Sequence, residues 1–204
     1  MREGPRLVIA TRNPGKLAEF RRLLAGGVWS VVGLEDTGFS RDVEEPFDTY
    51  AENARVKAAT VAAALDAPVL ADDSGIEVDA LGGWPGPLSA RWMGDGHSDR
   101  DRLDGLRAEV TRRCPTQPQV RYVCVLALAR PGAEVVTARG ETLGTLVEPR
   151  GDSGFGYDPA FLSVDTALTF AEATVEQKDE VSHRGRALRR MAAAGHFEAA
   201  ALAT

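Results

Sequence analysis

The feature that most constrains this chain is a run of apolar residues that leads directly into two adjacent carboxylates. Residues 69–71 are Val-Leu-Ala, Asp72 and Asp73 follow, and Ser74 and Gly75 come next. The apolar run predicts a buried strand, and Gly75 allows a sharp turn after the acids. Because ligands of open α/β sheets bind at the carboxyl ends of strands, we expect both acids at such an end. Neighbouring carboxylates repel, so a cation or a proton is expected between them; the alternative is a turn with solvated acids.

The composition predicts a water-soluble protein that does not bind long polyanions. The chain has 204 residues, enough for one domain or for two small lobes around one cleft, and 44% of them are hydrophobic. Its formal net charge of -6 argues against a basic nucleic-acid-binding face. No apolar run approaches the length of a membrane span, and no signal sequence is visible before the first apolar segment. We therefore expect a cytoplasmic protein with neither a nucleic-acid nor a membrane partner.

The chain begins with a predicted strand, a polar loop and a helix, and this arrangement predicts a phosphate-binding site. Residues 6–11 are mostly apolar and predict a strand, and residues 16–24 carry apolar side chains at helical spacing. The loop between them brings backbone N–H groups and Lys16 to a helix N-terminus, where anions bind favourably. It lacks the spacing of a Walker loop, and ordinary turn geometry would explain the same residues.

A second strand and a long helix follow this opening. Residues 29–34 predict the strand, and Thr49 with Glu52 forms a capping box that predicts an alanine-rich helix extending to about residue 65. Asn53 and Lys57 are one turn apart, so they share a face of this helix. Lys57 belongs either to an ordinary solvated face or to a site.

The second half of the chain alternates turn-rich loops with strands and helices. Residues 81–92 contain too many turn formers for regular structure, and Ser98 predicts the start of a helix that ends near residue 113. The predicted strands are residues 119–129, 134–141, 143–147 and 160–164. A short helix is expected around residues 176–178, then a polar break at residues 182–186 and a last helix over residues 187–194.

Five motifs, in order, resemble those of the inosine/xanthosine triphosphate pyrophosphatases, enzymes that hydrolyse deaminated purine nucleotides. The motifs are residues 10–16 (ATRNPGK), 50–57 (YAENARVK), 71–92 with ADDSG, LGG and SARW, 154–161 (GFGYDPAF) and 182–188 (SHRGRAL). Together they extend over nearly the whole chain. The chain departs from the family pattern at Glu45-Pro46-Phe47, where Glu-Thr-Gly is usual, so the second metal carboxylate is either Glu44 or Glu45.

The resemblance implies a two-lobed α/β fold with a mixed sheet and a central nucleotide-binding cleft, formed by one domain of residues 1–204 and usually assembled as a homodimer. It implies Mg²⁺-dependent hydrolysis of ITP, dITP or XTP to a monophosphate and pyrophosphate. Asp73 is the implied proton acceptor, and Glu45 and Asp73 are the implied metal ligands. The implied substrate-binding residues are Thr11, Arg12, Asn13, Pro14, Gly15, Lys16, Ser74, Phe155, Gly156, Tyr157, Asp158, Lys178, His183 and Arg184.

Within that set, residues 11–16 and Lys178 are expected on the triphosphate, and residues 155–158 with His183 and Arg184 on the base. Two other functions stay open at the level of the sequence. A Maf-type pyrophosphatase of other specificity resembles this fold but lacks the combined FGYD and SHR motifs. A non-catalytic nucleotide-binding regulator is disfavoured, because uncompensated acids beside a phosphate loop would weaken anion binding.

Overall fold

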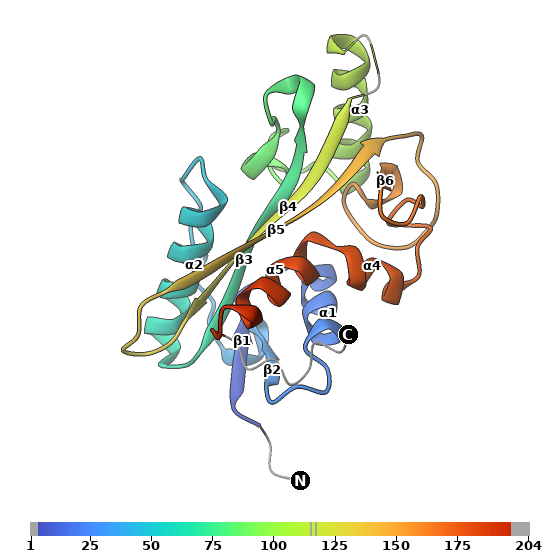
Figure 1. Cartoon of the computed structure of the whole chain (residues 1–204). Helices are drawn as coiled ribbons and strands as arrows, with labels where there is room; N and C mark the ends of the chain where they lie inside the picture. Colours follow the sequence, from blue (N-terminus) through green and yellow to red (C-terminus); the bar gives the residue numbers. More distant parts are fainter. Residues whose placement is uncertain (1–3, 115, 117, 197–204) are drawn as a thin grey trace. The chain divides into compact units, whose positions relative to one another are not determined.

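The computed structural model describes residues 4–114, 116 and 118–196 of the chain. Its strands are β1 (Arg6–Ile9), β2 (Ser30–Gly33), β3 (Val69–Val78), β4 (Gln119–Ala129), β5 (Val136–Leu146) and β6 (Phe161–Ser163). They form one sheet in the order β2-β1-β3-β4-β5-β6 (Figure 1). β1 is parallel to both β2 and β3, whereas β6 is antiparallel to β5. The predicted α/β class with a mixed sheet is therefore confirmed.

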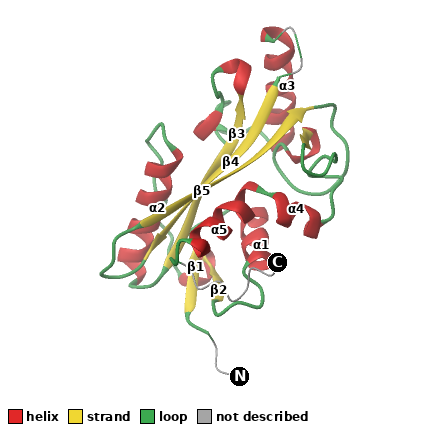
Figure 2. Ribbon diagram, viewed as in Figure 1, coloured by secondary structure: helices red, strands yellow, loops and turns green. Residues whose placement is uncertain are grey.

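Among the described residues, the α-helices are α1 (Pro14–Leu23), α2 (Tyr50–Leu65), α3 (Asp99–Arg113), α4 (Val175–Val181) and α5 (His183–Ala193), drawn in red in Figure 2. Four of them begin at a polar side chain that accepts a hydrogen bond from the backbone N–H three residues further on. These caps are Asn13, Thr49, Ser98 and Thr174. A capping oxygen satisfies one of the free N–H groups of the first turn. The helix starts predicted at Thr49 and Ser98 are thereby confirmed.

The chain folds into two compact units, and each is assembled from separate segments. Among the described residues, unit 1 comprises residues 4–73, 124–140 and 184–196, and unit 2 comprises residues 74–114, 116, 118–123 and 141–183. The strands β3, β4 and β5 each contribute residues to both units. Two units agree with the two lobes that the resemblance implies. The central cleft and a single functional domain stay predictions.

In unit 1, the two faces of the sheet are buried against different helices. One face carries Leu7, Ile9 and Leu70, which pack with Phe20 of α1 and Met191 of α5 in one apolar core. Figure 1 shows α2 on the opposite side of these strands. Because successive side chains of a strand point to opposite faces, each face of β3 carries every second residue.

Unit 2 is organised around an aromatic core. Tyr122 of β4 lies with its ring 4.5 Å from the ring of Phe161 and 5.7 Å from that of Phe170, almost parallel to the latter. Leu103 and Leu106 of α3 belong to the same core. Aromatic pairs at these distances contribute about 0.5–1.5 kcal/mol beyond their buried area. This core supports the loop that carries Phe155.

The structure corrects the predicted end of the central strand. β3 continues through Asp72, Asp73 and Gly75 to Val78, so the two acids lie in the middle of the strand and Gly75 forms no turn. The strand continues because apolar residues resume after the glycine, and Ile76 and Val78 are fully buried. The acids are therefore held by a rigid strand and not by a loop.

Two further predicted boundaries are wrong. β5 runs without interruption where two strands were expected. Within it, Gly144 lies against the ring of Phe161 and the carbonyl of Leu162, where a Cβ would collide with them. The predicted break at residues 182–186 is reduced to Ser182, since α4 ends at Val181 and α5 begins at the next residue but one. The first turn of α5 is polar in sequence, yet it is buried.

Candidate active site

The predicted phosphate loop of unit 1 is fixed by its own side chains. The Asn13 side chain accepts a hydrogen bond from the backbone N–H of Lys16 at 3.0 Å, and Thr11 Oγ1 accepts one from the N–H of Asn13 at 3.2 Å. Arg12 pairs with Asp42 at 3.3 Å. Pro14 and Gly15 form the first turn of α1. The strand, loop and helix predicted here are confirmed, and their contact with phosphate stays a prediction.

A cavity of about 270 Å³ lies beside this loop, within unit 1. Its wall includes Thr11 and three cationic residues, Arg12, Arg41 and Lys57, together with the carboxylate of Glu45. Anionic phosphate groups are stabilised by cationic side chains and by oriented N–H groups. The composition of this wall is therefore suited to phosphate oxygens and to a cation bound with them.

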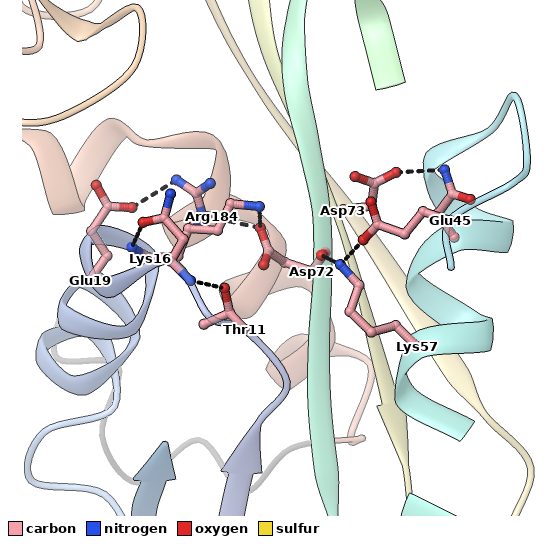
Figure 3. A network of polar contacts seen from close by, with 10 residues as sticks. Thr11, Lys16, Glu19, Glu45, Lys57, Asp72, Asp73 and Arg184 are labelled. Atoms are coloured by element: carbon pink, nitrogen blue, oxygen red, sulfur yellow. Dashed lines mark hydrogen bonds and ion pairs between the residues drawn. The ribbon is translucent and has the colours of Figure 1, made fainter. Parts of the chain in front are cut away.

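Asp72 lies on the α1 and α5 side of β3 among cationic side chains (Figure 3). Its Oδ2 atom is 2.9 Å from Lys16 Nζ and 3.4 Å from Arg184 Nε, and Arg184 also pairs with Glu19 at 2.8 Å. Lys57 Nζ donates to the backbone carbonyl of Asp72 at 2.8 Å. Burial alone would raise the pKa of Asp72, but the charges of Lys16, Arg184 and Lys57 outweigh it and hold this pKa well below its usual range.

Asp73 points to the opposite side of β3, toward α2 (Figure 3). Its Oδ2 atom accepts a hydrogen bond from Asn53 Nδ2 at 3.0 Å. Burial and the charge of Glu45 together raise the pKa of Asp73 to about 6, against the opposing effects of Asn53 and Lys57. A carboxylate that titrates near neutral pH is suited to accept a proton during catalysis.

The two carboxylates do not face each other, although the charges of Lys16 and Lys57 lower the pKa of both. Because they are consecutive residues of a continuous strand, Asp72 and Asp73 face opposite sides of the sheet and have different partners. Asp72 is neutralised by Lys16 and Arg184. Asp73 lies beside Glu45, which pairs with Lys57, and these two neighbouring carboxylates are suited to hold a cation.

Glu45 and Asp73 fit the donor set of a magnesium site. Lys57 forms an ion pair with Glu45, whereas Glu44 is exposed, so the structure favours Glu45 of the two alternatives. In the part of the chain that the structure describes, no group of three or more His, Cys, Asp or Glu side chains is placed to hold a metal. Mg²⁺ is commonly bound by one or two carboxylates with substrate phosphates completing its shell. Two carboxylates in the unit that carries the predicted phosphate loop agree with that pattern.

In unit 2, the loop of residues 154–158 is held by carboxylates. Asp158 Oδ2 accepts from the backbone N–H of Phe155 at 2.9 Å, and Asp99 Oδ2 accepts from that of Gly156 at 2.9 Å. Gly154 has a φ of 79°, and a Cβ there would collide with Asp158. Only glycine satisfies both requirements at this position. The loop therefore presents Phe155 in a defined conformation.

Lys178 and His183 lie around the same loop in unit 2. Lys178 Nζ is 2.6 Å from Asp158 Oδ2 and 5.1 Å from the centre of the Phe155 ring. The ring of His183 stacks on that of Tyr122 at 4.6 Å with an angle of 8°. Tyr122 also donates its hydroxyl hydrogen to Asp158 at 3.2 Å. These contacts combine cation, aromatic ring and carboxylate in one cluster.

The structure distributes the predicted site residues between the two units. Unit 1 contains Thr11, Arg12, Asn13, Pro14, Gly15, Lys16, Glu45, Asp73 and Arg184, and unit 2 contains Ser74, Phe155, Gly156, Tyr157, Asp158, Lys178 and His183. Ser74 is half-buried and continues β3 beyond the acids. The Tyr157 hydroxyl donates to the carbonyl of Ser89 at 2.7 Å and accepts from Trp92. Arg184 is 3% exposed and faces Glu19 and Asp72.

Sequence reasoning missed three residues that hold these groups in place. Glu19 lies one helical turn after Lys16, a spacing that places both on one face of α1. The sequence places Asn53 only on the face of α2 that it shares with Lys57, and Tyr122 only within the strand predicted for residues 119–129. Each is buried and carries a polar group that contacts a predicted site residue. Glu19 pairs with Arg184, Asn53 with Asp73, and Tyr122 with Asp158.

The mixed sheet, the phosphate-type loop and the buried carboxylates define an α/β protein with a polar site built on its central strand. The chain belongs to the Ham1 family, whose sequence profile matches residues 7–194. It is 41% identical over 185 residues to the dITP/XTP pyrophosphatase of Bacillus subtilis, covering 90% of this chain and 93% of that protein. It is 47% identical over 186 residues to the dITP/XTP pyrophosphatase of Symbiobacterium thermophilum, covering 91% and 92%.

A solved structure of similar fold is the Ham1 protein of Staphylococcus aureus, with a TM-score of 0.81, 34% identity and coverage of 95% of this chain and 99% of that chain. A HAM1 protein of Coxiella burnetii superposes with a TM-score of 0.83 at 32% identity, covering 93% and 98%. These similarities confirm the family that the five motifs predicted. They also decide against a Maf-type protein.

Proposed function

We propose that this protein hydrolyses deaminated purine nucleoside triphosphates, such as ITP, dITP and XTP, to the monophosphate and pyrophosphate. Relatives that are 41% and 47% identical over about nine-tenths of the chain carry the name dITP/XTP pyrophosphatase. The observation that carries the proposal is the environment of Asp73. It is a buried carboxylate whose pKa is raised to about 6, beside Glu45 and within the unit that holds the predicted phosphate loop.

In the proposed reaction, Asp73 accepts a proton from the water molecule that attacks phosphorus. A new P–O bond forms, the bond to the departing pyrophosphate breaks, and the electron pair of that bond leaves with pyrophosphate. Lys16 and the N–H groups at the start of α1 bind the phosphate oxygens and stabilise the charge on the leaving group. Lys178 is proposed to bind the same chain of phosphates.

We also propose that the reaction requires Mg²⁺, held by Glu45 and Asp73. Mg²⁺ would neutralise phosphate charge at the site. The support is the donor set itself, since burial and the neighbouring Glu45 carboxylate both raise the pKa of Asp73, and a bound cation would favour its ionised form. Lys57 holds Glu45 and the Asp72 carbonyl, and thereby orients the segment that carries one of the two ligands.

Base selection is proposed to reside in residues 155–158, His183 and Arg184. Phe155 can stack on either purine, so it is expected to add affinity and little selectivity. Inosine and xanthine carry an acceptor oxygen at position 6, where adenine carries a donor, and an arginine has only donors. The base-reading role of Arg184 stays a prediction, because its guanidinium is engaged with Glu19 and Asp72 in this structure.

We further propose a cytoplasmic homodimer without nucleic-acid or membrane partners. The net charge of -6 supports the lack of a nucleic-acid partner. The homodimer is proposed from the resemblance of the five motifs to the pyrophosphatase family, whose members are usually homodimers. Separately, none of the described helices is long and apolar enough to span a bilayer. The elution mass of the purified protein in solution tests the dimer.

The activity is tested by incubating the protein with dITP and Mg²⁺ and measuring pyrophosphate and orthophosphate separately. We expect pyrophosphate and dIMP in equal amounts, and no product after removal of divalent cations by a chelator. The same assay with XTP, ITP, GTP and ATP measures base selection. Release of orthophosphate and a diphosphate as first products would contradict the proposal, and binding without turnover would favour a regulator.

A further inference from the structure

Asn53 is a fully buried polar residue on α2 whose bonding pattern links two separate parts of unit 1. Its Oδ1 atom accepts a hydrogen bond from the backbone N–H of Phe47 at 3.0 Å. Its Nδ2 atom donates to the backbone carbonyl of Phe47 and to Asp73 Oδ2, each at 3.0 Å. One amide group therefore contacts the segment that follows Glu45 and also the side chain of Asp73.

The backbone of Phe47 determines which way this amide points. A backbone N–H can only donate, so the atom facing it must be the amide oxygen. The amide nitrogen then faces the Phe47 carbonyl with one hydrogen and has its second hydrogen available for Asp73. The donor to Asp73 is thus fixed by a second pair of hydrogen bonds and does not depend on the state of Asp73.

The same geometry relates the two predicted metal ligands to each other. Phe47 is two residues after Glu45 in a segment without regular secondary structure, so this segment needs an external anchor. Two hydrogen bonds between Asn53 and the backbone of Phe47 supply this anchor. A third hydrogen bond, donated by Asn53, reaches Asp73 itself. Lys57, one turn further along α2, forms an ion pair with Glu45.

We propose that Asn53 is a positioning residue that sets the spacing between Glu45 and Asp73 for a divalent cation. This inference rests on the proposed function, because it assumes that these two carboxylates hold the metal. Groups that orient metal ligands by hydrogen bonding typically change metal affinity about 10–100-fold when they are substituted. In this proposal Asn53 acts only through the two ligands, by its contacts with Phe47 and with Asp73.

The test measures Mn²⁺ binding to the nucleotide-free protein by electron paramagnetic resonance, with wild type, Asn53→Ala and Ala63→Ser compared. Ala63 is exposed on the same helix, so its variant controls for changes in α2 alone. Asn53→Ala is expected to weaken Mn²⁺ binding about 10–100-fold. With dITP as substrate, it should raise the Mg²⁺ concentration needed for half-maximal rate, and saturating Mg²⁺ should restore much of kcat. Ala63→Ser should match wild type.

A second variant keeps the test decisive if Asn53→Ala does not fold. Phe47→Pro removes the N–H that Asn53 accepts from and leaves the contact between Asn53 and Asp73 in place. Phe47→Ala truncates the same exposed side chain and keeps the N–H, so it is the matched reference. Phe47→Pro should bind Mn²⁺ more weakly than Phe47→Ala, with a smaller loss than Asn53→Ala.

Two outcomes separate this inference from the proposed function. If wild type releases pyrophosphate from dITP, but folded Asn53→Ala or Phe47→Pro binds Mn²⁺ as tightly as its reference, Asn53 has no positioning role and the proposed function stands. A lower unfolding temperature with unchanged Mn²⁺ affinity leads to the same conclusion. If wild type neither binds Mn²⁺ nor releases pyrophosphate, the proposed function itself fails, and this inference with it.

Discussion

On one face of β3 the Asp72 carboxylate lies among cationic side chains, whereas on the opposite face Asp73 lies beside another carboxylate. The first face holds Lys16 and Arg184, and Arg184 is itself balanced by Glu19. The second face holds Asn53 and Glu45, and Lys57 contacts Glu45. Consecutive residues of one strand thus have shifts of pKa in opposite directions.

The difference teaches that burial alone does not assign a role to an acid. Both side chains are nearly inaccessible, at 1% and 4% exposure, and burial raises the pKa of each. The charges and the hydrogen-bond donors around them differ. Asp72 is suited to hold Lys16 and Arg184 in place, and Asp73 is suited to exchange a proton and to hold a cation. The following predictions test this division.

The largest effect is expected from Asp73→Asn, which keeps the shape of the side chain and removes its ability to accept a proton. Loss of general-base action typically lowers kcat about 10²–10⁴-fold. Because Asp73→Asn also removes a proposed metal ligand, the assay uses saturating Mg²⁺, and under this condition the KM for dITP should change much less than kcat. Steady-state kinetics on dITP check this. If Asp72→Asn lowers kcat more than Asp73→Asn does, the roles of the two faces are reversed.

The next effect concerns stability on the Asp72 face. Arg184→Ala leaves Glu19 and Asp72 buried without this cation, and breaking a buried ion pair in this way costs about 3–5 kcal/mol of unfolding free energy. Urea unfolding measures the loss, and the double variant Glu19→Gln/Arg184→Ala should recover part of it. On the base-reading prediction, Arg184→Ala should also narrow the ratio of kcat/KM for ITP over ATP. A narrowed ratio without loss of stability would favour base reading over anchoring.

The two faces should also respond to pH with opposite sign. Because the pKa of Asp73 is raised from 3.8 to about 6, the folded state binds more protons than the unfolded state between these values, and stability falls as pH rises through this window. Asp72, with its lowered pKa, contributes stability above pH 3.8 that is lost as pH falls below it. The loss from Asp73 is at most about 3 kcal/mol, since each pKa unit corresponds to about 1.4 kcal/mol.

The comparison variant for this pH effect is Asp73→Asn, which removes the titrating group. Unfolding free energies measured from pH 4 to pH 7 should show the stability of Asp73→Asn rising relative to wild type up to about pH 6 and then staying constant. Parallel curves for the two proteins would mean that Asp73 is not perturbed in the folded state.

The smallest effect is expected in unit 2, where aromatic contacts replace ion pairs around the loop. Phe155→Ala should lower kcat/KM for ITP and for ATP by a similar factor. The loss of transition-state stabilisation should be roughly 1–3 kcal/mol, which is what stacking of a base on an aromatic ring contributes. The ratio between the two substrates should stay close to that of wild type. A large change in this ratio would give Phe155 a role in base selection.

Local patterns in the sequence predicted most elements and several site residues. The strand, loop and helix at residues 6–24 and the caps at Thr49 and Ser98 follow from short-range chemistry, and the structure contains them. The five motifs identified the family. The sequence did not predict that Asp72 and Asp73 point to opposite faces of the sheet. Gly75 indicated a turn after the acids, whereas β3 continues to Val78.

Contacts between distant residues explain what sequence reasoning missed. Arg184 meets Glu19 across 165 residues and Asp72 across 112 residues. These long-range pairs bury the polar first turn of α5, which reads locally as an exposed break. The contact of Asn53 with the site is likewise visible only in the fold, where its amide donates to Asp73, 20 residues later. Periodicity cannot report such partners, since it describes only which face of an element is apolar.

The ion pairs of Lys16, Lys57 and Lys178 have a consequence for protein chemistry. Only three of the 24 basic residues are lysines, and these three pair with Asp72, Glu45 and Asp158. All other basic side chains are arginines, which do not react with amine-selective acylating reagents. Apart from the α-amino group, such a reagent therefore has targets only within the polar clusters of the candidate site. Mass spectrometry of the acylated protein, with and without nucleotide, would map these clusters without any substitution.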